Sequence, residues 1–279
     1  MQEKRKAFVA YSSRDNAVSS QIEDAVSRAN ALATPYRFEP WIFNDVPGVP
    51  LLSPILEHIE DSAFIVADIT YLNLNVVYEI GFAIGRQKRV FLIRSKSTDG
   101  DKNLANTAGI FDTLGYFEYS GSQDLKDRLT SHVDLTVLPT VQNLDHKAPI
   151  YLVEPLTRSE ATGLLASRVK KAGYRYRSFN PSEDTRLSAT DAIRQVSVAS
   201  GVVMLLQSEG VEGSAEHNIR ALFVVGLAHG MGKPTLVLNP AGNDPPLDIR
   251  DSVKGFRHPD DIREHVAAFC PDEIGRAHV

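Results

Sequence analysis

One carboxylate in this sequence stands where a negative charge is costly. Glu79 lies within the stretch 72–93, whose pattern is typical of a polar loop, an amphipathic helix and a buried strand. Its neighbours on the helix are apolar: Val76, Val77, Ile80, Phe82, Ala83 and Ile84. A carboxylate in such surroundings needs a role or a partner, and it can stabilise or attack a developing positive charge. The alternative is an acidic residue in the first turn of a helix, which the helix dipole favours.

Strand and helix patterns alternate around this residue. Strands are predicted at 6–11, 36–43, 63–67, 89–93, 116–119, 150–153, 174–179 and 201–206. Helices are predicted at 16–32, 51–60, 122–133, 160–172, 192–198 and around 260–264, in addition to the one around Glu79. The stretch 223–238 repeats the Glu79 helix and the strand that follows it. Pro40 should end the second strand early or restrict it to a sheet edge. The alternation predicts an α/β fold with parallel sheets. The segment 95–103 is predicted as a polar loop and 137–147 as a linker, so the domains are expected at 1–140 and 148–279.

The second half of the chain repeats the first. Four residues recur with an offset of 145 positions, namely Gly81, Ala83, Gly85 and Lys88 as Gly226, Ala228, Gly230 and Lys233. Matched segments in one order favour a tandem duplication, and two unrelated α/β units of similar appearance are the alternative.

The two copies differ in their polar residues. Glu79 corresponds to Val224, and Asn75 corresponds to Arg220. Asn73 is kept as Asn218, whereas Asp68 falls opposite Leu206. We therefore expect an active first domain and a degenerate second domain that binds, shapes or dimerises.

Further polar and aromatic side chains follow the predicted strands of the first copy. Ligands of open parallel sheets lie outside the carboxyl ends of the strands. The side chains expected at that crevice, besides Glu79, are Tyr11, Ser12, Ser13, Arg14, Trp41, Asp68, Asn73 and Asn75. Three have plainer alternatives. Trp41 could be a packed core aromatic, Arg14 a solvated surface charge and Asp68 a helix or loop cap.

Two segments carry a resemblance to known families. Residues 77–83, VYEIGFA, followed by Lys88 and an apolar strand, resemble the signature helix of nucleoside 2-deoxyribosyltransferases. In that family the matching glutamate, here Glu79, is the nucleophile at C1′ of the sugar, and an acidic residue stands where this chain has Asn73. Residues 7–15, AFVAYSSRD, are similar to the first strand and loop of TIR domains, in which a glutamate on an equivalent helix supports cleavage of NAD. The resemblance implies two flavodoxin/TIR-like, doubly wound parallel-sheet domains in tandem.

The chemistry that the resemblance implies suits these residue types. Cleavage of a ribosyl–base bond develops positive charge on the sugar, which a carboxylate beneath C1′ can stabilise or attack. Asn73 or Asn75 could hold ribose hydroxyls, and Trp41 or Tyr11 could stack on a base. Ser12, Ser13 and Arg14 could take a phosphate near the start of the following helix.

Composition excludes several other classes. The net charge of −5 and the pI of about 5.9 do not indicate binding to nucleic acid or to an anionic membrane. The chain has one cysteine, Cys270, no apolar run of bilayer length and no signal peptide pattern, so we expect a cytoplasmic protein. Its histidines show no zinc-protease spacing, and we expect no metal and no cofactor beyond a nucleotide substrate.

The sequence therefore supports two classes of function. The first is an N-glycosidase, hydrolase or transferase, that acts on NAD or a (deoxy)nucleoside, as a homo-oligomer and in a role such as bacterial antiphage defence. The second is a non-catalytic sensor that binds a nucleotide signal and acts through assembly. A purely structural interaction module is a third possibility.

Overall fold

The computed structural model describes residues 4–41, 52–131, 135–140 and 147–270, and it contains two parallel sheets of five strands each. The first sheet has the order β2-β1-β3-β4-β5 and comprises β1 (Arg5–Ala10), β2 (Tyr36–Pro40), β3 (Phe64–Asp68), β4 (Arg89–Ser95) and β5 (Tyr116–Tyr119). The second has the order β10-β9-β8-β6-β7 and comprises β6 (Ile150–Val153), β7 (Tyr176–Phe179), β8 (Val202–Leu205), β9 (Thr235–Pro240) and β10 (Val253–Phe256). Both sheets have the same 2-1-3-4-5 topology, so the prediction of two doubly wound α/β domains in tandem is confirmed.

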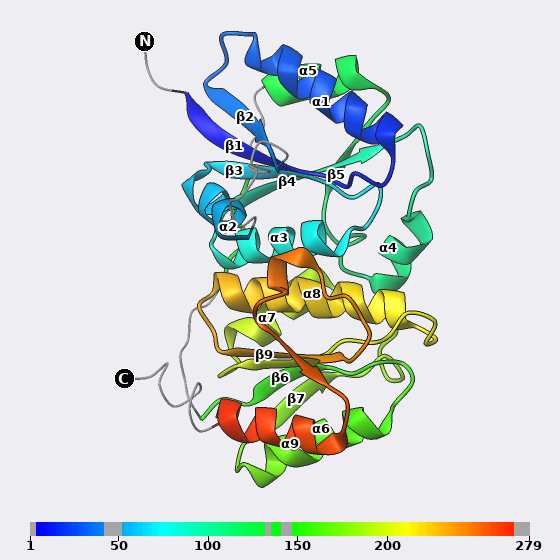
Figure 1. Ribbon diagram of the computed structural model, residues 1–279. Helices are drawn as coiled ribbons and strands as arrows, with labels where there is room; N and C mark the ends of the chain where they lie inside the picture. The colour runs from blue at the N-terminus through cyan, green and yellow to red at the C-terminus, as the bar shows by residue number, and fades with distance from the viewer. Residues whose placement is uncertain (1–3, 42–51, 132–134, 141–146, 271–279) are drawn as a thin grey trace.

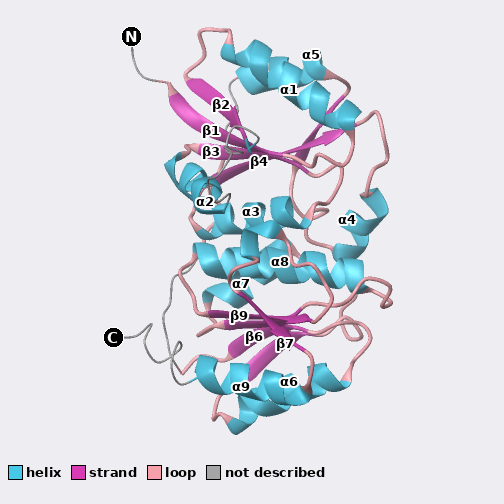
Figure 2. Ribbon diagram, in the orientation of Figure 1, coloured by secondary structure: helices cyan, strands magenta, loops and turns pink. Residues whose placement is uncertain are grey.

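Helices cover both faces of each sheet (Figures 1 and 2). The outer faces carry α1 (Asn16–Asn30) and α5 (Ser122–Thr130) in the first domain, and α6 (Glu160–Lys171) and α9 (Pro259–Ala268) in the second. The inner layers contain α2 (Leu52–Asp61), α3 (Leu74–Gly85), α4 (Lys102–Ala108), α7 (Ala189–Ser197) and α8 (Ser214–Gly230). Among the described helices, none combines the length and apolar character that a bilayer span requires.

The sequence explains where these elements begin and end. All five residues of β3 are buried, as expected for a central parallel strand covered on both faces. β2 ends at Pro40 and lies at the sheet edge, where a missing N–H group is tolerated. Asp15 caps α1, because its Oδ1 accepts hydrogen bonds from the backbone N–H groups of Ala17 and Val18 at 2.8 and 3.1 Å.

The two domains pack through α3 and α8, which lie against each other at the centre of the molecule (Figure 2). One continuous apolar core contains residues of both helices, and separate clusters lie under the outer helices of each domain. The four repeated glycines face this contact: a Cβ atom on any of them would overlap backbone atoms of the other helix. The repeated glycine pattern therefore serves the domain interface.

Three short elements were not predicted. α4 begins inside the predicted polar loop 95–103, and the 3-10 helix η2 (Leu247–Ile249) and β10 follow β9. α4 and η2 are related by the repeat, because each follows the fourth strand of its domain and contacts the central helix of the other. Short elements of this kind depend on tertiary contacts more than on local pattern.

Candidate functional site

Glu79 is a buried residue in the middle of α3, with only 4% of its surface exposed. The helix begins at Leu74, and its first turn contains no acidic residue. The alternative explanation of Glu79 as a first-turn residue favoured by the helix dipole is therefore wrong. Asn73 caps the helix instead, and its Oδ1 accepts a hydrogen bond from the backbone N–H of Asn75 at 2.8 Å.

Glu79 lines a cavity of about 230 Å³ at the carboxyl end of β1. The other lining residues are Tyr11, Ser13, Trp41, Ile55, Asn73, Asn75, Val76, Leu247 and Asp248. The structure thus brings Glu79 together with five residues predicted for the site, Tyr11, Ser13, Trp41, Asn73 and Asn75. The location agrees with the general position of ligands in doubly wound sheets, near the point where the strand order reverses.

Two aromatic rings form one side of this cavity. The ring centroids of Tyr11 and Trp41 are 6.0 Å apart, and the ring planes are inclined by 57°. The Tyr11 hydroxyl donates a hydrogen bond to Glu23 at 2.9 Å, which anchors the ring from behind. Burial, followed by the interactions with Glu23, raises the pKa of the Tyr11 hydroxyl, so that it stays neutral. The indole N–H of Trp41 is buried and has no partner among the described residues.

Three predicted residues lie outside the cavity. Ser12 is buried, and its Oγ accepts a hydrogen bond from the backbone N–H of Arg14 at 3.2 Å. The Arg14 side chain is 65% exposed, forms an ion pair with Asp101 at 3.1 Å and lies over the ring of Tyr71. Of the three residues predicted to bind a phosphate, Ser12, Ser13 and Arg14, only Ser13 lines this cavity.

Asp68 is the third predicted residue outside the cavity. It ends β3, and its carboxylate accepts hydrogen bonds from the hydroxyl and backbone N–H of Thr70 at 2.7 and 3.3 Å. Burial raises the pKa of Asp68 to about 7, against the opposing effect of the hydrogen bonds from Thr70. The hydroxyl of Thr70 also accepts a hydrogen bond from the backbone N–H of Ser95, so Asp68 organises the loop after β3. Asp68 therefore acts as the cap of the loop that follows β3, which was the alternative to a ligand-binding role.

The structure adds one acidic residue that the sequence analysis missed. Asp248, on η2 of the second domain, lines the cavity, and its carboxyl group hydrogen-bonds to that of Glu79. Its backbone N–H reaches Asn75 Oδ1 at 3.5 Å, and the next residue, Ile249, is fully buried in the shared core. The second domain therefore reaches into the cavity of the first.

The two carboxyl groups titrate as a pair. Burial, followed by the negative charge of Asp248, raises the pKa of Glu79 well above its usual range. Burial also raises the pKa of Asp248 to about 6, with the hydrogen bond from Glu79 acting in the opposite direction. Glu79 Oε2 and Asp248 Oδ2 are buried and have no donor among the described residues. A proton shared by the pair satisfies both groups, because two adjacent carboxylates cannot both ionise easily.

In the second domain a buried arginine stands at the position of Asn75. Arg220, the counterpart of Asn75, is buried, and its guanidinium donates hydrogen bonds to the backbone carbonyls of Ala108, Thr107 and Thr185 at 3.0, 2.6 and 2.8 Å. It also lies over the ring of Phe179, 5.0 Å from the centroid. Arg220 is thus held by backbone carbonyls where the first domain has Asn75, and Val224 stands where the first domain has Glu79.

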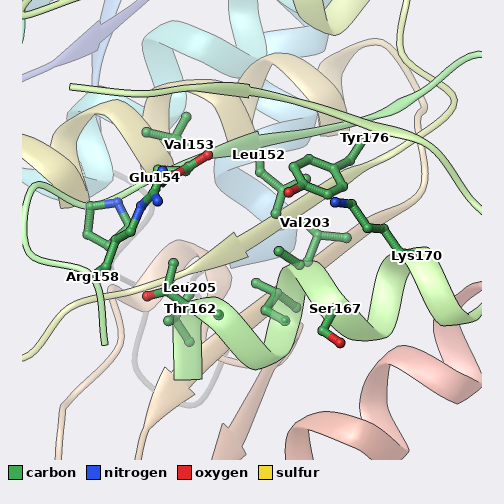
Figure 3. Close-up of a pocket in the computed structure, with 14 residues that line it drawn as sticks. Leu152, Val153, Glu154, Arg158, Thr162, Ser167, Lys170, Tyr176, Val203 and Leu205 are labelled. Carbon is green, nitrogen blue, oxygen red and sulfur yellow. Dashed lines mark hydrogen bonds and ion pairs between the residues drawn. The ribbon is translucent and has the colours of Figure 1, made fainter. Parts of the chain in front are cut away.

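A separate cavity of about 390 Å³ lies between α6 and the second sheet (Figure 3). Its acidic residue, Glu154, pairs with Arg158 at 2.6 Å and accepts a hydrogen bond from the Ser178 hydroxyl at 2.5 Å. Lys170 lies over the ring of Tyr176 at 5.3 Å. The charged groups of this cavity are thus paired with groups of opposite charge or with a ring, whereas Glu79 Oε2 and Asp248 Oδ2 have no donor among the described residues.

The sequence did contain a signal for Asp248. It stands between Leu247 and Ile249, two residues after a pair of prolines and soon after a buried strand, so it is a carboxylate in apolar company like Glu79. Recognising it as part of the Glu79 site required the packing of the two domains.

Among the residues that the structure describes, no group of three or more His, Cys, Asp or Glu side chains is arranged to hold a metal ion. A comparison of the chain with models of known protein families finds no match, and a comparison with curated proteins finds none either.

Proposed function

We propose that this protein is an N-glycosidase that cleaves the bond between a base and C1′ of a ribosyl group, with Glu79 as the carboxylate beneath C1′. One observation carries the proposal. A buried carboxyl group with an unpartnered oxygen lines a cavity that also presents two aromatic rings and two side-chain amides. These are the groups that a base and a sugar require, because rings stack on a base and amides bind hydroxyls.

Each group of residues that lines the cavity has a part in the proposed reaction. Loss of the base leaves oxocarbenium character at C1′, and the Glu79 carboxyl group at the buried wall of the cavity, once it has given up its proton, stabilises that charge or bonds to C1′. The apolar surroundings of α3 strengthen this electrostatic interaction. Trp41 and Tyr11 hold the base, while Asn75 and the helix cap Asn73 face the sugar.

The likeness of residues 77–83 to deoxyribosyltransferases and of residues 7–15 to TIR domains supports the same assignment. Both families act on bonds between ribose and a base, so NAD and deoxynucleosides are the first substrates to try. A role in nucleotide depletion or signalling, as in antiphage defence, is part of this proposal.

Product analysis tests the proposal directly. The protein is incubated with NAD and with each deoxynucleoside, and released base is separated by chromatography. We expect release of free base that falls by about 100-fold or more in Glu79→Gln, the scale of losing one preorganised electrostatic partner. Glu118→Gln, which changes an exposed carboxylate in the same domain, serves as the matched control and should retain full turnover.

The same experiment, combined with a measurement of the melting temperature, distinguishes a sensor from an enzyme. A sensor binds the nucleotide and raises the melting temperature without releasing base, because a ligand that binds only the folded state stabilises it. Full turnover by Glu79→Gln would remove Glu79 from the mechanism.

A further inference from the structure

A further cavity lies in the second domain, where β8 and β9 end. Its volume is about 320 Å³, which is within the range typical of pockets that bind small molecules. Side-chain amides and carboxylates make up much of its lining, and Leu74 of the first domain contributes to it. The carboxyl ends of parallel strands are where ligands of doubly wound sheets bind.

Two amide side chains of this cavity are buried without full hydrogen bonding. Gln207 is 8% exposed and Asn239 is 6% exposed. Within the described part of the chain, the side-chain amide of Gln207 makes no hydrogen bond, and Asn239 Oδ1 accepts none. A buried amide without a partner is costly to the fold. A ligand that supplies the missing partners would remove that cost.

Both residues are held in place by hydrogen bonds to other groups. Asn218 of α8 fixes the backbone of Gln207, because its Oδ1 accepts from the Gln207 N–H and its Nδ2 donates to the Gln207 carbonyl, both at 2.9 Å. Asn239 Nδ2 donates to the carbonyl of Asn243 at 2.9 Å, which orients the amide of Asn239. The cavity is therefore preorganised, and a ligand spends little free energy on ordering it.

The corresponding strand ends of the first domain are tied to each other. The hydroxyl of Thr70, after β3, donates a hydrogen bond to Asp68 at 2.7 Å and accepts one from the backbone N–H of Ser95 at 2.8 Å. A Cβ atom on Gly100 would lie 2.1 Å from the carbonyl oxygen of Thr70, so the loop after β4 packs on the loop after β3. The two copies thus use the same strand ends differently, with internal hydrogen bonds in the first domain and unpartnered amides in the second.

The lining favours an uncharged ligand that carries hydroxyl groups. Glu209 and Asp244 are exposed carboxylates, and the described residues that line the cavity include neither a lysine nor an arginine, so an anion would meet repulsion. The amide of Gln207 offers N–H donors as well as an acceptor oxygen. An ammonium group only donates and would leave these N–H groups unpaired, whereas a sugar hydroxyl both donates and accepts. Leu206 supplies apolar surface for the carbon atoms of the sugar ring.

This cavity and the Glu79 cavity share a wall. Leu74 lines the cavity of the second domain, while its two neighbours in the sequence line the Glu79 cavity. In the same way, Pro246 lines the first of these cavities, and the next two residues, which belong to η2, line the other. η2 also contacts α2 and α3. A ligand that moves Pro246 or Leu74 therefore changes the position of Asp248 relative to Glu79.

We propose that the second domain binds an unphosphorylated monosaccharide at the ends of β8 and β9, and that this ligand is an effector of the Glu79 cavity. The inference goes beyond the N-glycosidase function and does not require it, because binding and its effect on the Glu79 cavity are both measured without turnover. The effect arises because the sugar binds one arrangement of the shared wall better than another, and the coupling then acts in both directions.

Calorimetric titration tests the binding. D-ribose, D-glucose and D-galactose are the neutral probes, and ribose 5-phosphate and putrescine represent anions and cations. We expect at least one neutral sugar to bind, and the phosphate and the diamine to bind about 10-fold more weakly or less. Gln207→Met keeps the size of the side chain and removes the amide, so it should weaken binding of the sugar by about 10-fold or more. Gln195→Met, on α7 and outside this cavity, is the matched control and should bind like the unsubstituted protein.

Tryptophan emission tests the effector role. Trp41 is the single tryptophan of the chain, and it lines the Glu79 cavity and not the cavity of the second domain. Addition of the sugar should change its emission in the unsubstituted protein and in Glu79→Gln. In Gln207→Met, the sugar concentration that gives half of this change should rise by the same factor as the calorimetric dissociation constant.

Each contrary result overturns a particular part of the proposal. Binding of putrescine or ribose 5-phosphate as tight as that of the sugars would overturn the ligand class, in a comparison that uses only the unsubstituted protein. Failure of all three sugars to bind at millimolar concentration would overturn the site, and so would binding that Asn75→Ala weakens and Gln207→Met leaves unchanged. Binding without a change in Trp41 emission would overturn the effector role. The N-glycosidase function is decided separately, by release of base.

Discussion

Gly85 and Gly230 meet where the two domains touch. A Cβ atom on Gly85 would lie 2.9 Å from the Cα of Gly230, and a Cβ atom on Gly230 would lie 2.9 Å from the Cα of Gly85. The two residues correspond within the repeat, and so do Gly81 and Gly226, each one turn earlier on its helix. Residues four apart lie on one helix face, so α3 and α8 cross with their glycine faces in contact. This packing holds η2 beside Glu79.

Gly226→Ala should destabilise the protein. The new methyl group would overlap the backbone carbonyl of Tyr78, which cannot move like a side-chain end. Overpacking of this kind costs about 1–3 kcal/mol in the free energy of unfolding, measurable by urea denaturation. Gly163→Ala on α6 is the control, because nothing lies within 4 Å of its added Cβ. That variant should be neutral or gain up to about 1 kcal/mol from helix propensity. Equal behaviour of the two variants would contradict the close helix contact.

Arg220→Met should also lower the free energy of unfolding. The substitution removes the donor to three backbone carbonyls while keeping much of the apolar stem. We expect a loss of about 2–4 kcal/mol, because buried acceptors then lack partners. Arg177→Met, at an exposed position on β7, is the control and should change the stability by less than about 0.5 kcal/mol. A small effect at Arg220 would mean that water replaces its hydrogen bonds.

The pH dependence of stability should report the carboxyl pair. The folded pKa of Asp248 is about 6, and that of Glu79 is raised further above its usual range, so the folded protein holds protons that the unfolded chain releases. The pair's contribution to the free energy of unfolding is therefore retained below about pH 4 and falls as the pH rises through about 6 and beyond.

Glu79→Gln should reduce that dependence. Its stability relative to the unsubstituted protein should increase between about pH 5 and about pH 8, because only Asp248 then takes up a proton on folding. The measurement is urea denaturation at several pH values. Glu118→Gln, which changes an exposed group, should show a constant difference across the same range. A constant difference for Glu79→Gln as well would contradict the coupling of the two groups.

Trp41 offers a direct measure of ligand binding, because it is the single tryptophan of the chain and lines the cavity. Titration of Glu79→Gln with 2′-deoxyguanosine should change the tryptophan emission in a saturable way. In the otherwise unsubstituted protein, Trp41→Ala should raise KM by about 10-fold, in keeping with ~1–3 kcal/mol for stacking on a base. Trp41→Phe keeps a ring and should retain most of the affinity. An unchanged KM in Trp41→Ala would assign Trp41 to packing alone.

Local pattern was sufficient for the fold and for the apolar surroundings of Glu79. Strands such as β3 and helices such as α3 are encoded by hydrophobic periodicity over short windows, and the repeat of Gly81 as Gly226 revealed the tandem arrangement. The apolar neighbours of Glu79 lie on the same helix, so the sequence of that helix was enough to identify them. These features depend on residues that are close together in the sequence.

Only the tertiary structure decided which side chains share the cavity. Asp248 is 169 residues from Glu79, and the two meet because glycines let α3 and α8 approach closely. Arg14 turns away to Asp101, and Asp68 turns to Thr70, although both stood beside predicted strand ends. The direction of a loop side chain and the docking of one domain on another are set by long-range packing, which no local periodicity records.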